Sequence, residues 1–306
     1  MAIDTISEIH PILLAKEQPS FIQTPCVKDL VDRAVLYLKA GYPVHFCGPS
    51  GTGKTSLAMY VAGQLGRPLM IIHGDEEFVT SDLVGGEFGY RRKKVVDNFI
   101  HSVLKTDESV QSKWMDNRLT AACKNGFTLL YDEFTRSRPE ANNVLLSVLE
   151  ERILDLPAAR NTEGYLKVHP DFAAIFTSNP QEYAGVYRSQ DALRDRMISL
   201  KLGHYDRETE VEITCAKSGI SRPDAEKVVD IVRDLREHYG DGHIPTVRGA
   251  IMVARVIKLS RAEANAQDNY FVKACLDILD SEIKDENKTD GSDAKEKILN
   301  SIKKIC

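Results

Sequence analysis

The feature that most constrains this chain is a glycine-rich turn placed directly after a short apolar run. Residues 44–47 read Val-His-Phe-Cys, and the turn that follows contains Gly48, Gly53, Lys54 and Thr55 at the spacing of a phosphate-binding loop. Glycines let successive backbone N–H groups face an anion, and the helix that follows presents its positive N-terminal end to the same anion. Lys54 can then reach the β- and γ-phosphates of a nucleotide, and the Thr55 hydroxyl can bind Mg²⁺. The predicted loop consists of Gly48, Pro49, Ser50, Gly51, Thr52, Gly53, Lys54, Thr55 and Ser56.

The composition narrows the classes of protein that remain. The chain has 306 residues and a net charge of −5, so no overall basic field favours a nucleic-acid partner. The basic cluster at residues 90–94 lacks interleaved aromatics, which favours a partner-facing patch over a nucleic-acid contact. No secretory signal and no apolar run of membrane-spanning length is visible. The six cysteines stand singly, so we expect free thiols in a cytoplasmic protein without a membrane span.

Apolar runs and helical patterns alternate through the first two thirds of the chain. This alternation predicts an α/β fold in which a parallel sheet lies between helices. Two further runs, at residues 153–156 and 165–168, predict a hairpin, while residues 95–104 favour a helix and 105–116 a polar surface insertion. The strands of the sheet are expected at residues 44–47, 69–72, 127–131, 173–177 and 198–202.

The character of the chain changes near residue 205. Strand-like runs end there, and amphipathic helical patterns follow at residues 207–216, 223–238, 246–262 and 269–283. We therefore expect a small all-helical lid domain after the α/β domain. The predicted divisions are an N-terminal arm (1–25), an α/β nucleotide-binding domain (26–205), the lid domain (206–283) and a charged C-terminal tail (284–306).

An acidic pair follows the apolar run at residues 127–131. Asp132 stands where a carboxylate can hold Mg²⁺ through water at the carboxyl edge of a sheet, and Glu133 follows, placed to orient and polarise an attacking water. By itself such a pair is more often the N-cap of the next helix. In combination with the phosphate loop, the pair predicts a hydrolytic site.

Two further polar residues extend this predicted site. Asn179 ends the run at residues 173–177 and can hydrogen-bond the γ-phosphate or the lytic water, although Asn-Pro is also an ordinary turn dipeptide. Arg248 opens a predicted helix after Pro245 and Thr246, from which it can cover the phosphates of its own subunit. Both residues are therefore candidates for contact with the nucleotide.

Arg194 and Arg196 lie just before the apolar run at residues 198–202. From there an arginine can reach the ATP of a neighbouring subunit and stabilise charge that develops on the γ-phosphate. The alternative is a surface ion pair with Asp191 or Asp195, which contributes little to stability.

Taken in order, these motifs resemble those of an AAA+ ATPase. The hairpin before Asn179 and the inserted region around residues 86–116 resemble the MoxR branch of that family. Within the branch, residues 72–86, 131–143 and 177–186 resemble a family of gas vesicle ATPases.

The resemblance implies a role for each candidate residue. Residues 48–55 match Walker A, Asp132 and Glu133 match Walker B, Asn179 matches sensor 1, and Arg248 matches sensor 2. The arginine finger best matches Arg196, because it fills the arginine of the Asp-Arg-Phe pattern usual in the branch. Met197 stands where that pattern has Phe, and Arg194 where an apolar residue is usual, so both arginines remain candidates.

The resemblance also implies a function: a Mg²⁺-dependent, ATP-hydrolysing assembly factor that works as a ring, of six subunits by family analogy. Its work would be the formation of gas vesicles, with their shell or accessory proteins as partners, in the cytoplasm or on the vesicle. One alternative is a MoxR-type ATPase that activates a metalloenzyme or another enzyme. A second is a structural component of the vesicle that ATP switches without turnover, and a third, disfavoured by the acidic charge, is an ATPase that acts on DNA.

Overall fold

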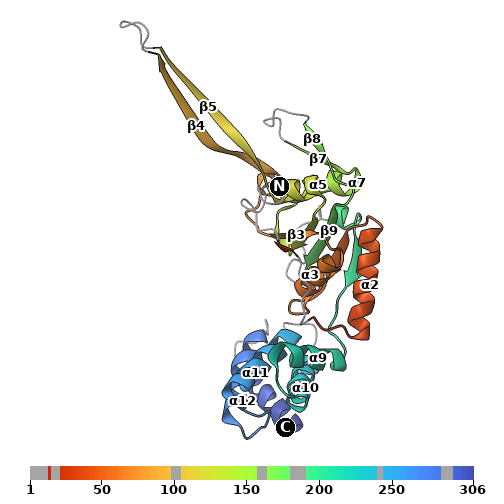
Figure 1. The fold of residues 1–306 in the computed structure, drawn as a ribbon. Helices are drawn as coiled ribbons and strands as arrows, with labels where there is room; N and C mark the ends of the chain where they lie inside the picture. Colours follow the sequence, from red (N-terminus) through yellow and green to blue (C-terminus); the bar gives the residue numbers. More distant parts are fainter. Residues whose placement is uncertain are drawn as a thin grey trace. The chain divides into compact units, whose positions relative to one another are not determined.

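The structure is a computed structural model of the chain. It describes residues 13–14, 21–97, 105–156, 164–179, 191–239, 244–283 and 292–306. These residues divide into two compact units, which we call the sheet unit and the helical unit (Figure 1). The sheet unit consists of Met1–Lys16, Ala34–Phe46 and Val61–Leu200, and the helical unit of Glu17–Arg33, Cys47–Tyr60 and Lys201–Cys306.

A sheet with strand order β1-β3-β6-β9-β2-β10 organises the sheet unit. β3, β6 and β9 pair in parallel, and β1 pairs antiparallel with β3. In this register Tyr131 of β6 lies opposite Phe176 of β9, so the residues that follow these two strands emerge side by side. The strands are β1 (Leu13–Leu14), β2 (Val44–Cys47), β3 (Pro68–His73), β6 (Thr128–Asp132), β9 (Ala173–Ser178) and β10 (Ile198–Lys201).

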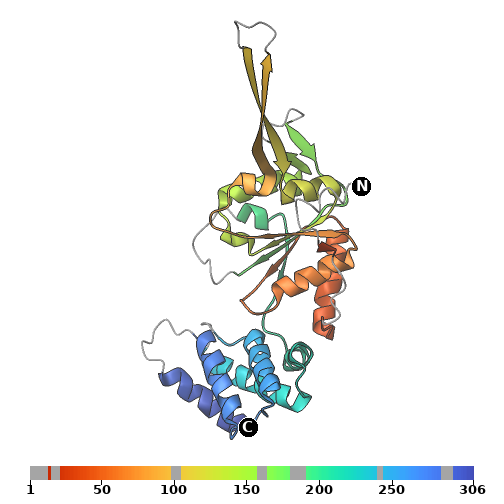
Figure 2. The same ribbon diagram turned by 60° about the vertical axis from the view of Figure 1, so that its left-hand side comes forward.

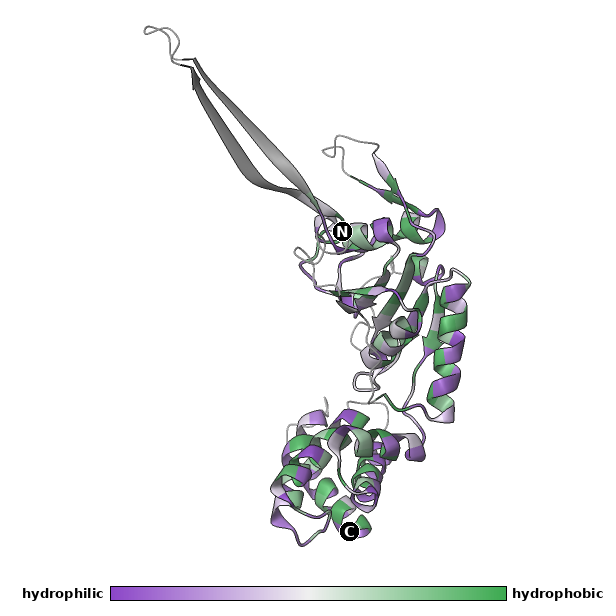
Figure 3. Ribbon diagram, in the orientation of Figure 1, coloured by the Kyte–Doolittle hydropathy of each residue, from purple (hydrophilic) through white to green (hydrophobic). Residues whose placement is uncertain are grey.

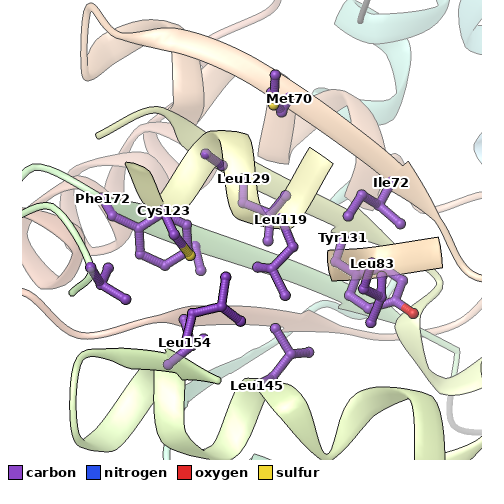
Figure 4. Packing of buried hydrophobic residues seen from close by; sticks show 14 of the residues in the cluster. Met70, Ile72, Leu83, Leu119, Cys123, Leu129, Tyr131, Leu145, Leu154 and Phe172 are labelled. Atoms are coloured by element: carbon purple, nitrogen blue, oxygen red, sulfur yellow. The ribbon is translucent and has the colours of Figure 1, made fainter. Parts of the chain in front are cut away.

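The strands form because their side chains are buried on both faces, as parallel sheets between helices require. Every residue of β6 and of β9 is buried. Figure 4 shows the core on one face, where Leu129 and Tyr131 of the sheet pack among Leu119, Leu145 and their neighbours. The predicted α/β architecture is therefore confirmed, and so is the predicted hairpin, formed by β7 (Ile153–Asp155) and β8 (Tyr165–Lys167).

Helices lie on both sides of the sheet (Figure 2). Helical patterns in the sequence cover α2, α3 and α7, but α4, α5 and α6 were not expected: α4 lies within a segment of turn formers, and α5 and α6 are only two turns and one turn long. Asn117 caps the N-terminus of α5 with its side chain, and Gly126 ends the helix in a left-handed conformation. Among the residues that the structure describes before β10, the helices and a 3₁₀ turn are α2 (Pro25–Lys39), α3 (Lys54–Gln64), α4 (Thr80–Val84), α5 (Arg118–Asn125), η1 (Phe134–Arg136), α6 (Pro139–Asn142), α7 (Val144–Glu150) and α8 (Asp191–Arg194).

The largest correction concerns the segment between α4 and α5. A helix was predicted over 95–104 and a surface insertion over 105–116, but the chain forms the long antiparallel hairpin of β4 (Gly85–Asp97) and β5 (Lys105–Asp116). Residues 98–104 of the predicted helix lie outside the described residues. Pairing with a partner strand overrides a local helical pattern, since a strand's stability comes from cross-strand contacts that periodicity does not reveal.

Amphipathic helices build the helical unit beyond β10. They are α9 (Arg207–Ser218), α10 (Arg222–Tyr239), α11 (Val247–Ser260), α12 (Asn269–Glu282) and α13 (Ser292–Ile305). Figure 3 shows hydrophilic and hydrophobic residues along each of α10, α11 and α12, and the hydrophobic ones form one core. Asp206, Thr246 and Asp268 cap the N-termini of α9, α11 and α12. The predicted helical region after the sheet is confirmed.

The C-terminal residues differ from the charged tail that the sequence predicts. Residues 284–291 lie outside the described residues, but α13 is a packed helix whose Ile298 and Ile302 are buried in the core of the helical unit. Ser301 and Lys304 of α13 also donate hydrogen bonds to Asp234 of α10. The apolar positions recur every four residues, so a helix can bury them while its many charged residues stay in water.

Candidate functional site

The phosphate loop runs from β2 to the first residue of α3, Lys54. At its start, Gly48 lies so close to the neighbouring chain that a Cβ there would be 2.2 Å from the Leu202 carbonyl oxygen. The Leu202 N–H donates a 2.8 Å hydrogen bond to the Cys47 carbonyl. Only glycine permits this approach, so the first glycine of the motif is required by packing as well as by phosphate binding.

Lys54 and Thr52 are both turned toward the loop itself. The Lys54 ammonium donates to the Pro49 carbonyl at 2.7 Å, and the Thr52 hydroxyl donates to the same oxygen at 2.9 Å. Both side chains are buried, whereas Thr55 is half-buried and Ser56 is exposed. A buried ammonium held inside a curled loop is a strong local positive charge, which suits a phosphate ligand.

The far side of the loop contacts the start of α11. Gly51 has a φ of +76°, and a Cβ on it would lie 2.3 Å from the Thr246 hydroxyl oxygen. Thr246 is the N-cap of α11, and its hydroxyl accepts a hydrogen bond from the Arg248 N–H at 3.2 Å. Thr246 therefore contacts the phosphate loop directly, and the exposed Arg248 lies two residues after it in the chain.

A second cluster forms in the sheet unit, where β6 and β9 end. Asp132 is buried, and its carboxylate accepts a 2.6 Å hydrogen bond from the Thr177 hydroxyl. The same Thr177 oxygen accepts from the Glu133 N–H at 2.9 Å. His73, at the end of β3, places Nδ1 3.5 Å from the other Asp132 oxygen. Thr177 was not singled out from the sequence, but the register of β6 and β9 places it directly beside Asp132 and Glu133.

Glu133 leaves the strand with an unusual backbone conformation. Its φ is +52°, in the left-handed region that costs a non-glycine residue on the order of 1 kcal/mol. Its carboxylate receives a 2.9 Å hydrogen bond from the Arg136 guanidinium, and both side chains are exposed. Asn179 follows β9 directly and is buried. Asp132, Glu133 and Asn179 thus follow neighbouring strands at one edge of the sheet, as expected.

His45 is a buried residue of β2 that sequence analysis did not single out. Its Nε2 lies 2.8 Å from the Ser178 hydroxyl on β9, and its Nδ1 lies 3.0 Å from the Ser199 hydroxyl on β10. Burial, together with the positive charge of Arg194, lowers its pKa to about 4. A neutral imidazole therefore links the three strands next to Asn179. The signal available in the sequence was a lone polar residue within an apolar strand.

The two arginine-finger candidates differ in their surroundings. Arg196 donates to a Glu150 carboxylate oxygen at 2.6 Å and to the Ala192 carbonyl at 2.6 Å, and it is half-buried. Arg194 is the last residue of α8 and is exposed. Glu150, on α7, was not expected as a partner, because the sequence places it far from the arginines.

The chemistry of these groups fits a nucleotide and a divalent cation. The loop offers backbone N–H groups, a helix N-terminus and the Lys54 charge, which together favour phosphate oxygens. Carboxylate and hydroxyl oxygens, such as those of Asp132 and Thr55, are the hard ligands that Mg²⁺ prefers. Among the described residues, no group of three His, Cys, Asp or Glu side chains is arranged to hold a metal.

Comparison with known proteins identifies the domain and the fold. Residues 43–197 match the family model described as the AAA domain of the dynein-related subfamily. A point mutant of RuvB from Thermotoga maritima has a similar structure, with a TM-score of 0.53 over 87% of this chain and 74% of that one. At 18% sequence identity this likeness shows the fold alone.

The curated relatives are more similar in sequence. A protein named gas vesicle ATPase GvpN from Ancylobacter aquaticus is 51% identical over 89% of this chain and 76% of its own length. A protein of the same name from Haloferax mediterranei is 44% identical over 90% of this chain and 78% of its own length. No helix in the described part of the chain is long and apolar enough to cross a bilayer.

Proposed function

The chain belongs to the GvpN family of gas vesicle ATPases, and from this premise we propose that it couples ATP hydrolysis to remodelling of shell or accessory proteins while gas vesicles form. ATP hydrolysis itself follows from the AAA domain and the family. The observation that carries the proposal is sequence identity with proteins of that name over nine tenths of the chain.

We assign ATP binding to the phosphate loop. Residues 48–56 surround the phosphates, and Lys54 neutralises the β- and γ-oxygens. Thr55 and Asp132 hold Mg²⁺, which supplies charge neutralisation at the phosphates. The support is the loop with its buried Lys54 and the buried carboxylate of Asp132 at the end of β6.

We assign the hydrolytic step to residues that follow the strands. Glu133 orients and polarises the attacking water, and Asn179 hydrogen-bonds that water or the γ-phosphate. Arg248 stabilises the phosphate charge from the helical unit. The left-handed backbone of Glu133 supports its role, because strained residues persist where surrounding structure and function require them.

The most direct test of this assignment is Glu133→Gln in a host that forms gas vesicles and lacks its own copy of this protein. We expect bound ATP but at least about a hundredfold slower hydrolysis, because the amide cannot polarise water, and we expect no vesicles. Glu140→Gln, an exposed change on α6, is the matched control and should behave as wild type. If the Glu133→Gln variant still formed normal vesicles, ATP hydrolysis would not be needed, and a structural role switched by ATP binding would be supported instead.

We further propose that the active form is a ring, of six subunits by family analogy, and that it works in the cytoplasm or on the vesicle. In such a ring an arginine of one subunit completes the ATP site of the next. Arg196 and Arg194 are the two candidates for this arginine.

Mixing two inactive variants tests the shared site. Glu133→Gln carries an intact arginine and Arg196→Ala an intact glutamate, so an equal mixture should recover about a quarter of wild-type activity through mixed interfaces. Arg194→Ala in the same mixture shows which arginine acts in the neighbouring site. No recovery with either arginine variant, or full activity of both alone, would contradict the shared site.

A further inference from the structure

The helical unit contains a buried ion cluster close to the phosphate loop. Glu210 of α9 and Arg236 of α10 pair at 2.6 Å, and their side chains are only 2% and 9% exposed. Arg233 approaches the other Glu210 oxygen at 3.3 Å. Buried charges are costly to desolvate, and a hydrophobic pair of similar size often stabilises a fold as well. Stability alone therefore does not explain why these charges are buried.

Arg236 reaches from this cluster to the turn before α11. Its Nη1 donates to Glu210, and its Nε donates to the Pro245 carbonyl at 2.6 Å. Within the described part of the chain its buried Nη2 makes no hydrogen bond. The rigid guanidinium thus joins two elements at once, which a flexible ammonium cannot do with the same geometry.

A second, half-buried charge binds the same turn from α12. The Glu282 carboxylate accepts a 2.9 Å hydrogen bond from the Thr246 N–H. It also packs against the first turn of α11, because a Cβ on Gly249 would lie 2.5 Å from the same carboxylate oxygen. A carboxylate at a helix N-terminus is electrostatically favourable. Burial raises the pKa of Glu282, while the Thr246 hydrogen bond and the charges of Arg248 and Arg236 oppose that rise.

The turn held by these two charges is the one that contacts the phosphate loop. Thr246 packs against Gly51 on one side, and its backbone is bound by Glu282 on the other. Arg248 follows two residues later on the same first turn of α11. Arg236 and Glu282 therefore both bond the backbone of the turn that precedes Arg248.

We propose that Arg236 and Glu282 are positioning residues for ATP hydrolysis, which hold the turn from Pro245 to Arg248 against the phosphate loop. They touch neither ATP nor water and act through Arg248. The inference rests on the proposed roles of the phosphate loop and Arg248. It explains why a costly buried ion cluster lies beside this turn.

Arg236→Lys tests the inference, because it keeps the charge near Glu210 but loses the fork that also reaches Pro245. We expect kcat to fall about tenfold and the preference for ATP over ADP to weaken, with a smaller change in KM. Glu282→Gln should shift kcat and the nucleotide preference in the same direction. The matched control is Arg207→Lys, which changes an exposed arginine paired with Asp230 in the same unit and should leave both quantities unchanged.

A double-mutant cycle separates positioning from general loss of structure. If Arg236 acts through Arg248, then Arg236→Lys added to Arg248→Ala should lower kcat no further, whereas independent effects would multiply. Wild-type kcat and ATP preference in both Arg236→Lys and Glu282→Gln, or fully multiplicative effects in the cycle, would overturn the inference. If Lys54→Ala and Arg248→Ala also kept full activity, the proposed ATP site itself would be wrong, so the two failures are distinguishable.

Discussion

The two compact units position their polar side chains by different means. In the sheet unit, Asp132 and Thr177 meet because β6 and β9 pair in register above an apolar core. In the helical unit, Arg236 and Glu282 bond the turn before α11, and buried Glu210 pairs with buried Arg236. In a paired sheet, many backbone hydrogen bonds share the positioning of the side chains. In an ion cluster, the position of each group depends on every charge in the cluster. Single substitutions should therefore cost most stability in the helical unit and affect chemistry more selectively in the sheet unit.

The largest expected stability effect is that of Glu210→Ala. It leaves Arg236 buried with a lost partner, which should lower the free energy of unfolding by about 3–5 kcal/mol. Urea unfolding followed by circular dichroism measures the change. Glu212→Ala, on the same helix but exposed and paired with exposed Arg222, should move the urea midpoint very little. If both substitutions lowered the urea midpoint equally, the buried ion pair would not be a special source of stability in the helical unit.

A pH titration tests the contribution of buried His45 to the stability of the sheet unit. The pKa of His45 is about 4 in the folded chain against an ordinary 6.5, so the unfolded chain takes up its proton first as the pH falls. His45 therefore contributes stability that is present above about pH 6.5 and is lost progressively toward pH 4, by about 3 kcal/mol in all.

The measurement is urea unfolding from about pH 7.5 to about pH 5, with His45→Gln as the reference because its side chain keeps a donor and an acceptor. The wild type should lose more stability over this range than the variant. Parallel pH curves for the two proteins would mean that protonation of His45 is not opposed by burial.

Thr177→Val should have the smallest effect on stability of these three substitutions. It should nevertheless lower the rate of ATP hydrolysis. It removes the hydrogen bonds to Asp132 and from the Glu133 N–H, so kcat should fall about tenfold to a hundredfold while the chain loses only about 1–2 kcal/mol of stability. Thr128→Val is the matched control, since its buried hydroxyl on β6 has no hydrogen-bond partner among the described residues. That variant should keep wild-type kcat. A similar loss in both would assign the effect to strand packing.

Much of the fold and of the candidate site could be predicted from local patterns. The strand at residues 44–47 and the glycines after it carry their own signal, because a phosphate loop needs its residues adjacent in sequence. Helices α9 to α12 were predictable for a similar reason, since amphipathic periodicity is a local property. The pairing of β4 with β5 was not, because the stability of each strand comes from contacts with the other.

Local sequence was enough to predict the phosphate loop, the acidic pair at residues 132 and 133, the strands around them and the amphipathic helices α9 to α12, since each depends on neighbouring residues. Three sets of contacts depend on the folded chain: Thr177 bonds Asp132, His45 links three strands, and Arg236 and Glu282 bond the turn before Arg248. These contacts join residues far apart in the chain. Strand register and helix packing create these contacts, and neither can be predicted from the local pattern of a single sequence.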